Sequence, residues 1–231
     1  MHVVLSIGGS SINPAGTPDL EFLRAMAQLI KKSKNCFGIL AGGSSIARTY
    51  AKAARELGSG EYEADSIAIT STKQNAQLVV AALATAGIDV HRTVAPGFEE
   101  AKEAAAIRKV VVMGGTIPGI TTDTDAVLLA EAIGAKRVVN ISNVDAIYDS
   151  DPKTNPAAQK FVRMNYEELV QLAGASDKRL AGTNFVFDML ACRLIARSKI
   201  ETHFVGGKNR SDVENAIEGK KHNGTVVSAQ E

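Results

Sequence analysis

Three turns rich in glycine and hydroxyl residues follow short apolar runs, and turns of this kind can hold an anion or a nucleotide. They are IGGSS (7–11), AGGSSIAR (41–48) and MGGTIPGITT (113–122). Glycine lets the backbone approach a ligand closely. At the carboxyl ends of parallel strands, such turns lie where open α/β sheets bind ligands. One such turn also makes a tight connection without any ligand, but three together predict a ligand site.

None of the three turns is a familiar nucleotide-binding loop. No GxGxxG follows the first apolar run, so the dinucleotide fingerprint is missing. GGTIPGIT has the glycine spacing of the Walker loop, but Ile120 stands where that motif needs a lysine for the phosphates. The first turn leads into the irregular stretch INPAG, so we expect its amides to form a nest rather than the end of a helix.

The second turn leads straight into a helical pattern, which we expect Ser44 or Ser45 to cap. Arg48 follows about one turn later, and helical side chains lean toward the N-terminus. A guanidinium fork beside free amides suits a phosphate group. The alternative is that Arg48 belongs to a solvated face, as we expect for Lys52 and Arg55.

The third turn leads into an acidic helix start. Thr122 and Asp125 have the spacing of a capping box, and Asp123 lies between them. Carboxylates here favour the helix dipole and repel a phosphate. The turn therefore suits the neutral part of a nucleotide, a base or a sugar, which its hydroxyl and backbone groups can bind.

A long acidic loop, NVDAIYDSDPK (143–153), follows another apolar run. Asp145, Asp149 and Asp151 are able to hold magnesium or a ribose, or simply to form Asx turns. Tyr148 is able to flank a ring. Two distant cysteines and four scattered histidines show no ligand spacing, so we expect no metal site built by the protein alone.

Apolar runs and helical patterns alternate along the chain and would position these residues. The runs are continuously apolar, as in a parallel sheet covered on both faces. The alternation predicts an α/β fold with helices on both sides of the sheet. Strands are expected at 2–7, 36–41, 109–114, 137–142 and 201–206, and helices at 19–33, 45–57, 74–86, 125–133, 165–173 and 185–198.

The bulk composition is that of a globular protein. The chain has 231 residues, 45% of them hydrophobic, and a net charge of +1 from 26 basic and 25 acidic residues. This balance favours neither nucleic acid nor an anionic membrane as a partner. The start MHVVLSIGG does not resemble a signal peptide, and no apolar run approaches the roughly 20 residues of a membrane span. We expect a cytoplasmic protein.

Together, the segments SIGGSS, AGGSSIAR, VVVMGGTIPGITTDTDAVLLAE and NVDAIYDSDPK resemble the amino acid kinase superfamily, most closely its archaeal-type uridylate (UMP) kinases. The later segments 181–200 and 222–228 are also similar. The resemblance implies a three-layer α/β/α sandwich with a mainly parallel central sheet, forming a single domain over residues 1–231. About residues 1–135 would hold UMP, and about residues 136–231 would hold ATP.

The resemblance implies phosphoryl transfer from ATP to UMP, giving UDP and ADP in pyrimidine nucleotide biosynthesis. Magnesium would be held mainly by nucleotide phosphates, and the chain would assemble as a homohexamer. The UMP contacts would be Gly43, Asp65, Thr116, Ile117, Pro118, Gly119, Ile120, Thr121 and Thr122. The ATP contacts would be Gly9, Ser10, Ser44, Arg48, Ser142, Tyr148 and Asp151, with Asn143 and Asp145 as supporting residues and Arg48 as the catalytic candidate.

The chain departs from the superfamily pattern at four positions. Ser6 stands where many members have a lysine, Ser44 replaces a glycine, Ser45 stands where lysine is common, and Ala146 replaces a glycine. The Ser6 departure leaves open which group carries positive charge to the transferred phosphate.

Other functions remain as alternatives. One is another small-molecule phosphate kinase, such as an isopentenyl phosphate kinase, although no histidine lies in the three turns. A second is a non-catalytic ligand-binding or storage protein on the same scaffold. The missing GxGxxG disfavours a dehydrogenase.

Overall fold

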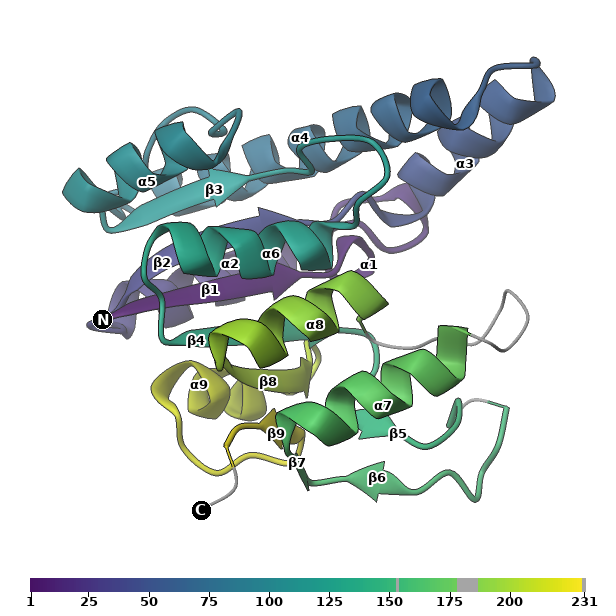
Figure 1. Cartoon of the computed structure of the whole chain (residues 1–231). Helices are drawn as coiled ribbons and strands as arrows, with labels where there is room; N and C mark the ends of the chain where they lie inside the picture. The colour runs from purple at the N-terminus through teal and green to yellow at the C-terminus, as the bar shows by residue number, and fades with distance from the viewer. Residues whose placement is uncertain (153, 178–186, 230–231) are drawn as a thin grey trace.

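The computed structural model describes residues 1–152, 154–177 and 187–229 (Figure 1). In this part of the chain one sheet has seven strands in the order β3-β2-β1-β4-β8-β9-β7, and a small hairpin lies beside it. The first five strands in this order pair in parallel, whereas β9 runs antiparallel to β8. The strands are β1 (His2–Ile7), β2 (Cys36–Ala41), β3 (Val110–Met113), β4 (Arg137–Ser142), β7 (Arg163–Met164), β8 (Glu201–Gly206) and β9 (Thr225–Val227), with β5 (Ile147–Tyr148) and β6 (Lys160–Phe161) in the hairpin.

Helices cover both faces of the sheet. Leu5 points to the face covered by α2, α4 and α9, whereas its neighbour Val4 points to the face covered by α5, α6, α7 and α8. The three-layer α/β/α sandwich is therefore confirmed. The helices are α1 (Gly9–Ile12), α2 (Leu20–Lys32), α3 (Ser44–Glu56), α4 (Glu61–Thr85), α5 (Phe98–Ile107), α6 (Thr122–Ala132), α7 (Tyr166–Asp177), α8 (Met189–Ser198) and α9 (Arg210–Glu218), with a 3₁₀ turn at Pro14–Gly16.

The five apolar runs are strands because both of their faces are buried. Val3, Val4 and Leu5 of β1 are each 0% exposed, as expected for a strand with a helical layer on each side. Five strands at the predicted places are thereby confirmed. None of the helices of the described chain is long and apolar enough to cross a membrane.

Three helices of the described chain, α1, α5 and α9, were not predicted, and α4 is longer than predicted. The patterns of α5 and α9 are short, and α4 begins at Glu61 rather than at residue 74. The first half of α4 carries serine and threonine, which bond back to the preceding turn: Ser66 Oγ donates to Tyr62 O, and Thr70 Oγ1 donates to Ser66 O. Packing against α3 stabilises this weak sequence as a helix. The helix predicted at 185–198 begins at Met189, and residues 185–186 lie outside the described residues.

Candidate active site

The order of the strands places a switch point between β1 and β4. From β1 the chain builds outward through β2 and β3, and then returns to place β4 on the other side of β1. Open α/β sheets bind ligands at the carboxyl ends of the strands at such a point. Hydrogen bonds join the turns at this edge: Gly42 N donates to Ile7 O over 2.9 Å, and Gly8 N donates to Ile141 O over 2.8 Å.

The first two turns pack so closely that Gly9 and Gly42 leave no room for a side chain. A Cβ atom on Gly9 would lie 2.0 Å from Ser44 N, and one on Gly42 would lie 2.5 Å from Gly9 N. The two turns therefore pack backbone to backbone, and the packing alone explains these glycines. The expectation of an irregular nest after β1 is wrong, because the four-residue helix α1 begins at Gly9.

The second turn differs in detail from the prediction. Neither Ser44 nor Ser45 precedes α3, because the helix begins at Ser44 and its N-cap residue is Gly43. Ser44 has φ +64°, a left-handed conformation that favours glycine, and its Oγ accepts a hydrogen bond from Ile46 N over 3.3 Å. The backbone geometry thus explains why a glycine suits the position of Ser44.

Arg48 lies on the outer side of the second turn. It is exposed on α3, and within the described residues it forms no hydrogen bond or ion pair. Arg55, two turns later, is already paired with Glu61 through a contact of 2.6 Å. Lys52 pairs with Glu56 over 3.6 Å. Arg48 is therefore available to an anionic ligand in a way that these two neighbours are not.

Residues of α4 hold the second and third turns together. Thr72 Oγ1 accepts a hydrogen bond from Gly115 N over 2.7 Å, and Asn75 Nδ2 donates to Gly42 O over 2.7 Å. Both side chains are buried. Sequence reasoning missed Thr72 and Asn75, since a lone polar residue in a helix carries no local signal of such a role.

The loop Thr116–Thr122 is half-buried to exposed, and carboxylates hold it at its start and in its middle. Asp65, from α4, accepts a hydrogen bond from Gly119 N over 2.9 Å. Asp125, from α6, accepts from Thr116 N over 3.1 Å and from Thr116 Oγ1 over 2.6 Å. The acidic groups therefore shape the loop from behind and leave its outer surface open.

The predicted capping box at the start of α6 is wrong. Thr121 is the cap, and its Oγ1 accepts from the backbone N–H groups of Asp123 and Thr124 over 3.2 Å each. Asp125 is drawn away to Thr116, so it does not complete a box. Thr121 Oγ1 also donates to Asp188, the N-cap of α8, over 2.5 Å. Asp188 thus joins the starts of two helices that come from the two halves of the chain.

The departure at Ser6 has a local consequence. Ser6 Oγ donates to Asp123 Oδ1 over 2.8 Å. Burial raises the pKa of Asp123 to about 7, and the nearby Asp188 adds to the rise. Burial also raises the pKa of Asp125 to about 6. Both carboxyl groups at the base of the site therefore have pKa values above the usual range of aspartate.

A cavity of about 260 Å³ opens at the switch point. Ser10 from the turn after β1, and Ser142 and Asn143 from the turn after β4, line it together. The structure thus brings together three of the residues predicted for ATP. Lys208, from the loop between β8 and α9, and Arg210, the first residue of α9, also line the cavity. They were not predicted because no pattern marked this loop.

Comparison with known proteins identifies the family of this chain. A family model described as the amino acid kinase family matches residues 1–206. The chain belongs to the amino acid kinase family. The family assignment confirms the superfamily resemblance and excludes the dehydrogenase alternative.

Within the amino acid kinase family, the similar relatives carry one name. A uridylate kinase of Thermococcus kodakarensis is 41% identical over 229 residues, covering 98% of this chain and 99% of the relative. A uridylate kinase of Archaeoglobus fulgidus is 40% identical over 228 residues, covering 99% and 100%. The resemblance to archaeal-type uridylate kinases is therefore confirmed.

Solved structures from the family share the fold. The crystal structure of uridylate kinase from A. fulgidus matches with a TM-score of 0.86 at 39% identity, covering 99% of this chain and 100% of that chain. The UMP kinase structure from Bacillus anthracis matches with a TM-score of 0.79 at 20% identity, covering 98% and 95%. At this lower identity the likeness concerns the fold alone.

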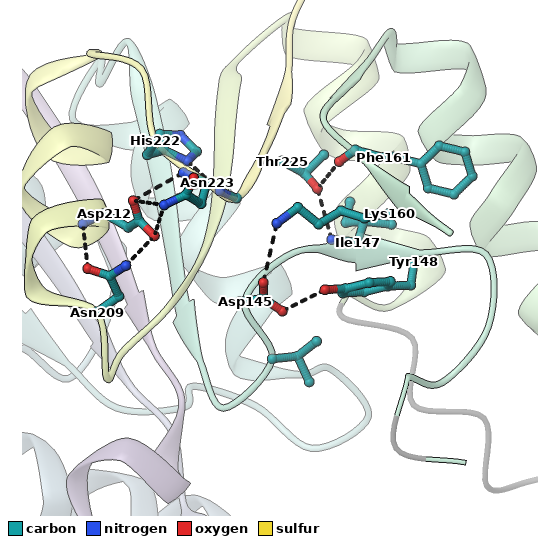
Figure 2. A network of polar contacts seen from close by, with 12 residues as sticks. Asp145, Ile147, Tyr148, Lys160, Phe161, Asn209, Asp212, His222, Asn223 and Thr225 are labelled. Atoms are coloured by element: carbon teal, nitrogen blue, oxygen red, sulfur yellow. Dashed lines mark hydrogen bonds and ion pairs between the residues drawn. The ribbon is translucent and has the colours of Figure 1, made fainter. Parts of the chain in front are cut away.

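The other predicted ATP residues lie outside the lining of the cavity: Gly9, Ser44, Arg48, Tyr148 and Asp151. Figure 2 shows Tyr148 on the hairpin, its Oη donating to Asp145 Oδ1 over 2.9 Å, while Lys160 Nζ lies 3.3 Å from Asp145 Oδ2. Asp149 accepts hydrogen bonds from Ser150 Oγ and Gln159 N. These bonds within the loop favour a role for Asp149 in shaping the loop over a role as a ligand-binding group. The aspartates of this loop thus mainly organise the loop itself.

The described residues contain no group of three or more His, Cys, Asp or Glu side chains that could hold a metal ion. A divalent cation at this edge would therefore need oxygen atoms from a ligand as well as from the protein.

Proposed function

We propose that this chain is a UMP kinase, which transfers the terminal phosphoryl group of ATP to the phosphate of UMP and yields UDP and ADP for pyrimidine nucleotide synthesis. The observation that carries the proposal is the 41% identity to a uridylate kinase over 98% of this chain. The two turns that pack against each other through Gly9 and Gly42 support it, because they give a donor and an acceptor nucleotide adjoining places.

UMP would lie over the loop Thr116–Thr122, in the half formed by about residues 1–135. The open surface of this loop presents hydroxyl and backbone groups to the base and ribose. Asp65 uses Oδ2 to hold Gly119 N, and within the described residues its Oδ1 accepts no hydrogen bond. Oδ1 is therefore available to a ribose hydroxyl. The phosphate of UMP would point toward Gly43.

ATP would lie in the half formed by about residues 136–231, with its phosphates over Gly9, Ser10 and Ser44. The hydroxyl of Ser142 and the amide of Asn143 line the same cavity. Tyr148 and Asp151, on the neighbouring loop, would contact the nucleoside end. Magnesium, held mainly by phosphate oxygens, would neutralise charge during the transfer.

Phosphoryl transfer demands positioning and charge neutralisation more than covalent chemistry. The phosphate of UMP is already a nucleophile, so no general base is required. Arg48 is the proposed catalytic residue, because it is a cation without a protein partner in the described chain and lies one turn from Ser44. Its guanidinium would bind the oxygens of the phosphoryl group in transit.

One assay separates this proposal from its alternatives. Purified protein receives Mg-ATP with each of several nucleoside monophosphates or with isopentenyl phosphate, and the release of ADP is measured. We expect release with UMP above all others. Release with isopentenyl phosphate alone would assign the chain to another phosphate kinase of this family. No release with any acceptor would favour a non-catalytic ligand-binding protein.

We also propose that the chain self-associates, as a homohexamer built from dimers, in the cytoplasm. Large apolar side chains are exposed on α3 and the start of α4, which extend beyond the carboxyl edge of the sheet (Figure 1). An exposed apolar patch of this kind is typical of a surface that another protein covers.

A further inference from the structure

One cation that lines the cavity at the switch point, Lys208, is not among the proposed ATP contacts. Lys208 lines this cavity together with Ser10 and Ser142, at the edge where β1 and β4 end. It is exposed, and within the described residues it donates no hydrogen bond and forms no ion pair. A lysine of this kind places a positive charge at the cavity that no protein group of the described chain neutralises.

The other charged groups of the lining are already engaged. Arg210 pairs with Glu21 through a contact of 2.5 Å between Nη2 and Oε1. Asp19 caps α2, accepting a hydrogen bond from Phe22 N over 2.8 Å. Lys208 is therefore the cation of the lining that has no protein partner among the described residues.

The backbone on both sides of Lys208 is anchored to this edge. Gly207 N donates to Ser142 O over 2.8 Å, and Asn209 N donates to Gly206 O over 3.2 Å. A Cβ atom on Gly207 would lie 3.2 Å from Ser11 Oγ, so the loop packs closely against the turn after β1. Only the side chain of Lys208 needs to move to reach a ligand in the cavity.

The first strand, in contrast, supplies no cation. Ser6 stands at the position where many superfamily members have a lysine, and its hydroxyl is committed to Asp123 over 2.8 Å. The triphosphate of ATP still needs positive charge beyond that of magnesium, and Arg48 lies on α3 beyond the second turn.

We propose that Lys208 binds the phosphate tail of ATP and supplies the positive charge that the first strand lacks. This inference rests on the proposed kinase function for its ligand. An ammonium group forms strong charge-assisted hydrogen bonds with phosphate oxygens and acts there as a point charge. The hydroxyl group of Ser10, which lines the same cavity, adds a donor for these phosphates. The hydroxyl group of Ser142 already donates to Val144 O over 2.9 Å, so it adds no donor.

The test compares the affinities of ATP and of adenosine for the full-length protein by calorimetry. Lys208→Ala should weaken ATP binding by about tenfold or more, the loss of one charge-assisted hydrogen bond, and leave adenosine binding unchanged. Lys208→Arg should keep ATP affinity within about threefold, since the charge is retained. Lys220→Ala, an exposed lysine beside a different cavity, is the matched control.

Ionic strength gives a second readout. Exposed charges are screened by salt, so ATP affinity of the native chain should fall more steeply with salt than that of Lys208→Ala. ATP affinity of Lys208→Ala within about twofold of the native value would overturn the proposal, as would equal losses for ATP and adenosine. Because binding is measured directly, a native chain that binds ATP but releases no ADP with UMP would refute the kinase proposal and leave this test intact.

Discussion

Asp123 is an unusual carboxyl group for the start of a helix. The dipole of α6 favours its charge, yet burial and the neighbouring Asp188 raise its pKa to about 7. The hydroxyl of Ser6 and the amide of Asn140, the latter at 3.4 Å from Oδ1, partly offset that rise. With serine rather than lysine at position 6, the partner of Asp123 on β1 is a neutral hydroxyl, and the pKa of Asp123 lies near neutral pH.

Stability should depend on pH through Asp123. The folded chain keeps the proton between about 4 and about 7, where the unfolded chain has lost it, so the contribution of this group to stability falls as pH rises through that window. The side chain of Asp123→Asn stays neutral at every pH. The free energy of unfolding of this variant, relative to that of the native chain, should therefore be higher at pH 8 than at pH 5. Urea unfolding at both pH values measures the difference.

The control for that experiment is Glu103→Gln, which changes an exposed carboxylate on α5. It should shift the native stability equally at both pH values. If the difference in unfolding free energy between Asp123→Asn and the native chain were the same at pH 5 and pH 8, the prediction would be wrong.

Arg48→Ala should lower turnover by more than about tenfold, because a charge contact to the reacting phosphate is lost. Its unfolding free energy should change by less than about 0.5 kcal/mol, since the side chain is exposed and unpaired within the described residues. Steady-state rates and urea unfolding measure the two effects. Lys52→Ala, on the same helix, is the control, and activity of Arg48→Ala within about threefold of the native rate would rule out the proposed role.

Among the elements, α4 and α8 fix the position of the loop Thr116–Thr122. Thr72 and Asn75 of α4 each hold one of the turns, while Asp188 at the start of α8 accepts hydrogen bonds from Thr121 and Thr124. The loop Thr116–Thr122 is thus held by an element that precedes it in the chain and by one that follows it. A displacement of α8 would therefore also move the loop Thr116–Thr122.

Asp188→Ala should have two effects, which a matched capping variant separates. Loss of the cap of α8 should cost about 0.5–2 kcal/mol of stability. Loss of the contacts to Thr121 and Thr124 should also raise the KM for UMP several-fold. Asn165→Ala, which removes the side chain that accepts from Glu168 N at the start of α7, should cost similar stability and leave the KM for UMP unchanged. If both variants raised the KM for UMP equally, the contacts of Asp188 to Thr121 and Thr124 would not be the cause.

At the scale of the whole molecule, the extension formed by α3 and the start of α4 stands out in Figure 1. Leu57 is 87% exposed, and Tyr50 and Tyr62 are also exposed on the same pair of helices. These helices pack against each other, so the extension is itself folded. It presents apolar surface that an isolated monomer would leave in water.

The double variant Tyr50→Glu and Leu57→Glu should therefore reduce the assembly to smaller species, because buried carboxylates without partners are costly. Size-exclusion chromatography with light scattering measures the mass. Ile107→Glu, at an exposed apolar position on α5, is the control and should leave the mass unchanged. A monomeric native chain, or a double variant of native mass, would contradict self-association through this surface.

Much of the architecture could be predicted locally. Continuous apolar runs such as 137–142 predict buried parallel strands because both faces of each strand meet helices. The three turns were correctly located for the same reason, since glycine and hydroxyl residues interrupt the patterns where strands end. The short strands of the hairpin and the two short helices α5 and α9 escaped prediction because their patterns are too brief to exceed those of loops.

The roles of individual residues in the site depended on partners far away in the chain. Gly9 and Gly42 are glycines because each turn touches the other, and Asp125 leaves its expected cap to hold Thr116. Lys208 reaches the cavity only because β8 lies next to β4. Local periodicity reports which face of an element is buried, whereas the order of strands in the sheet sets which distant side chains meet. That order follows from packing the whole chain, so no single segment carries it.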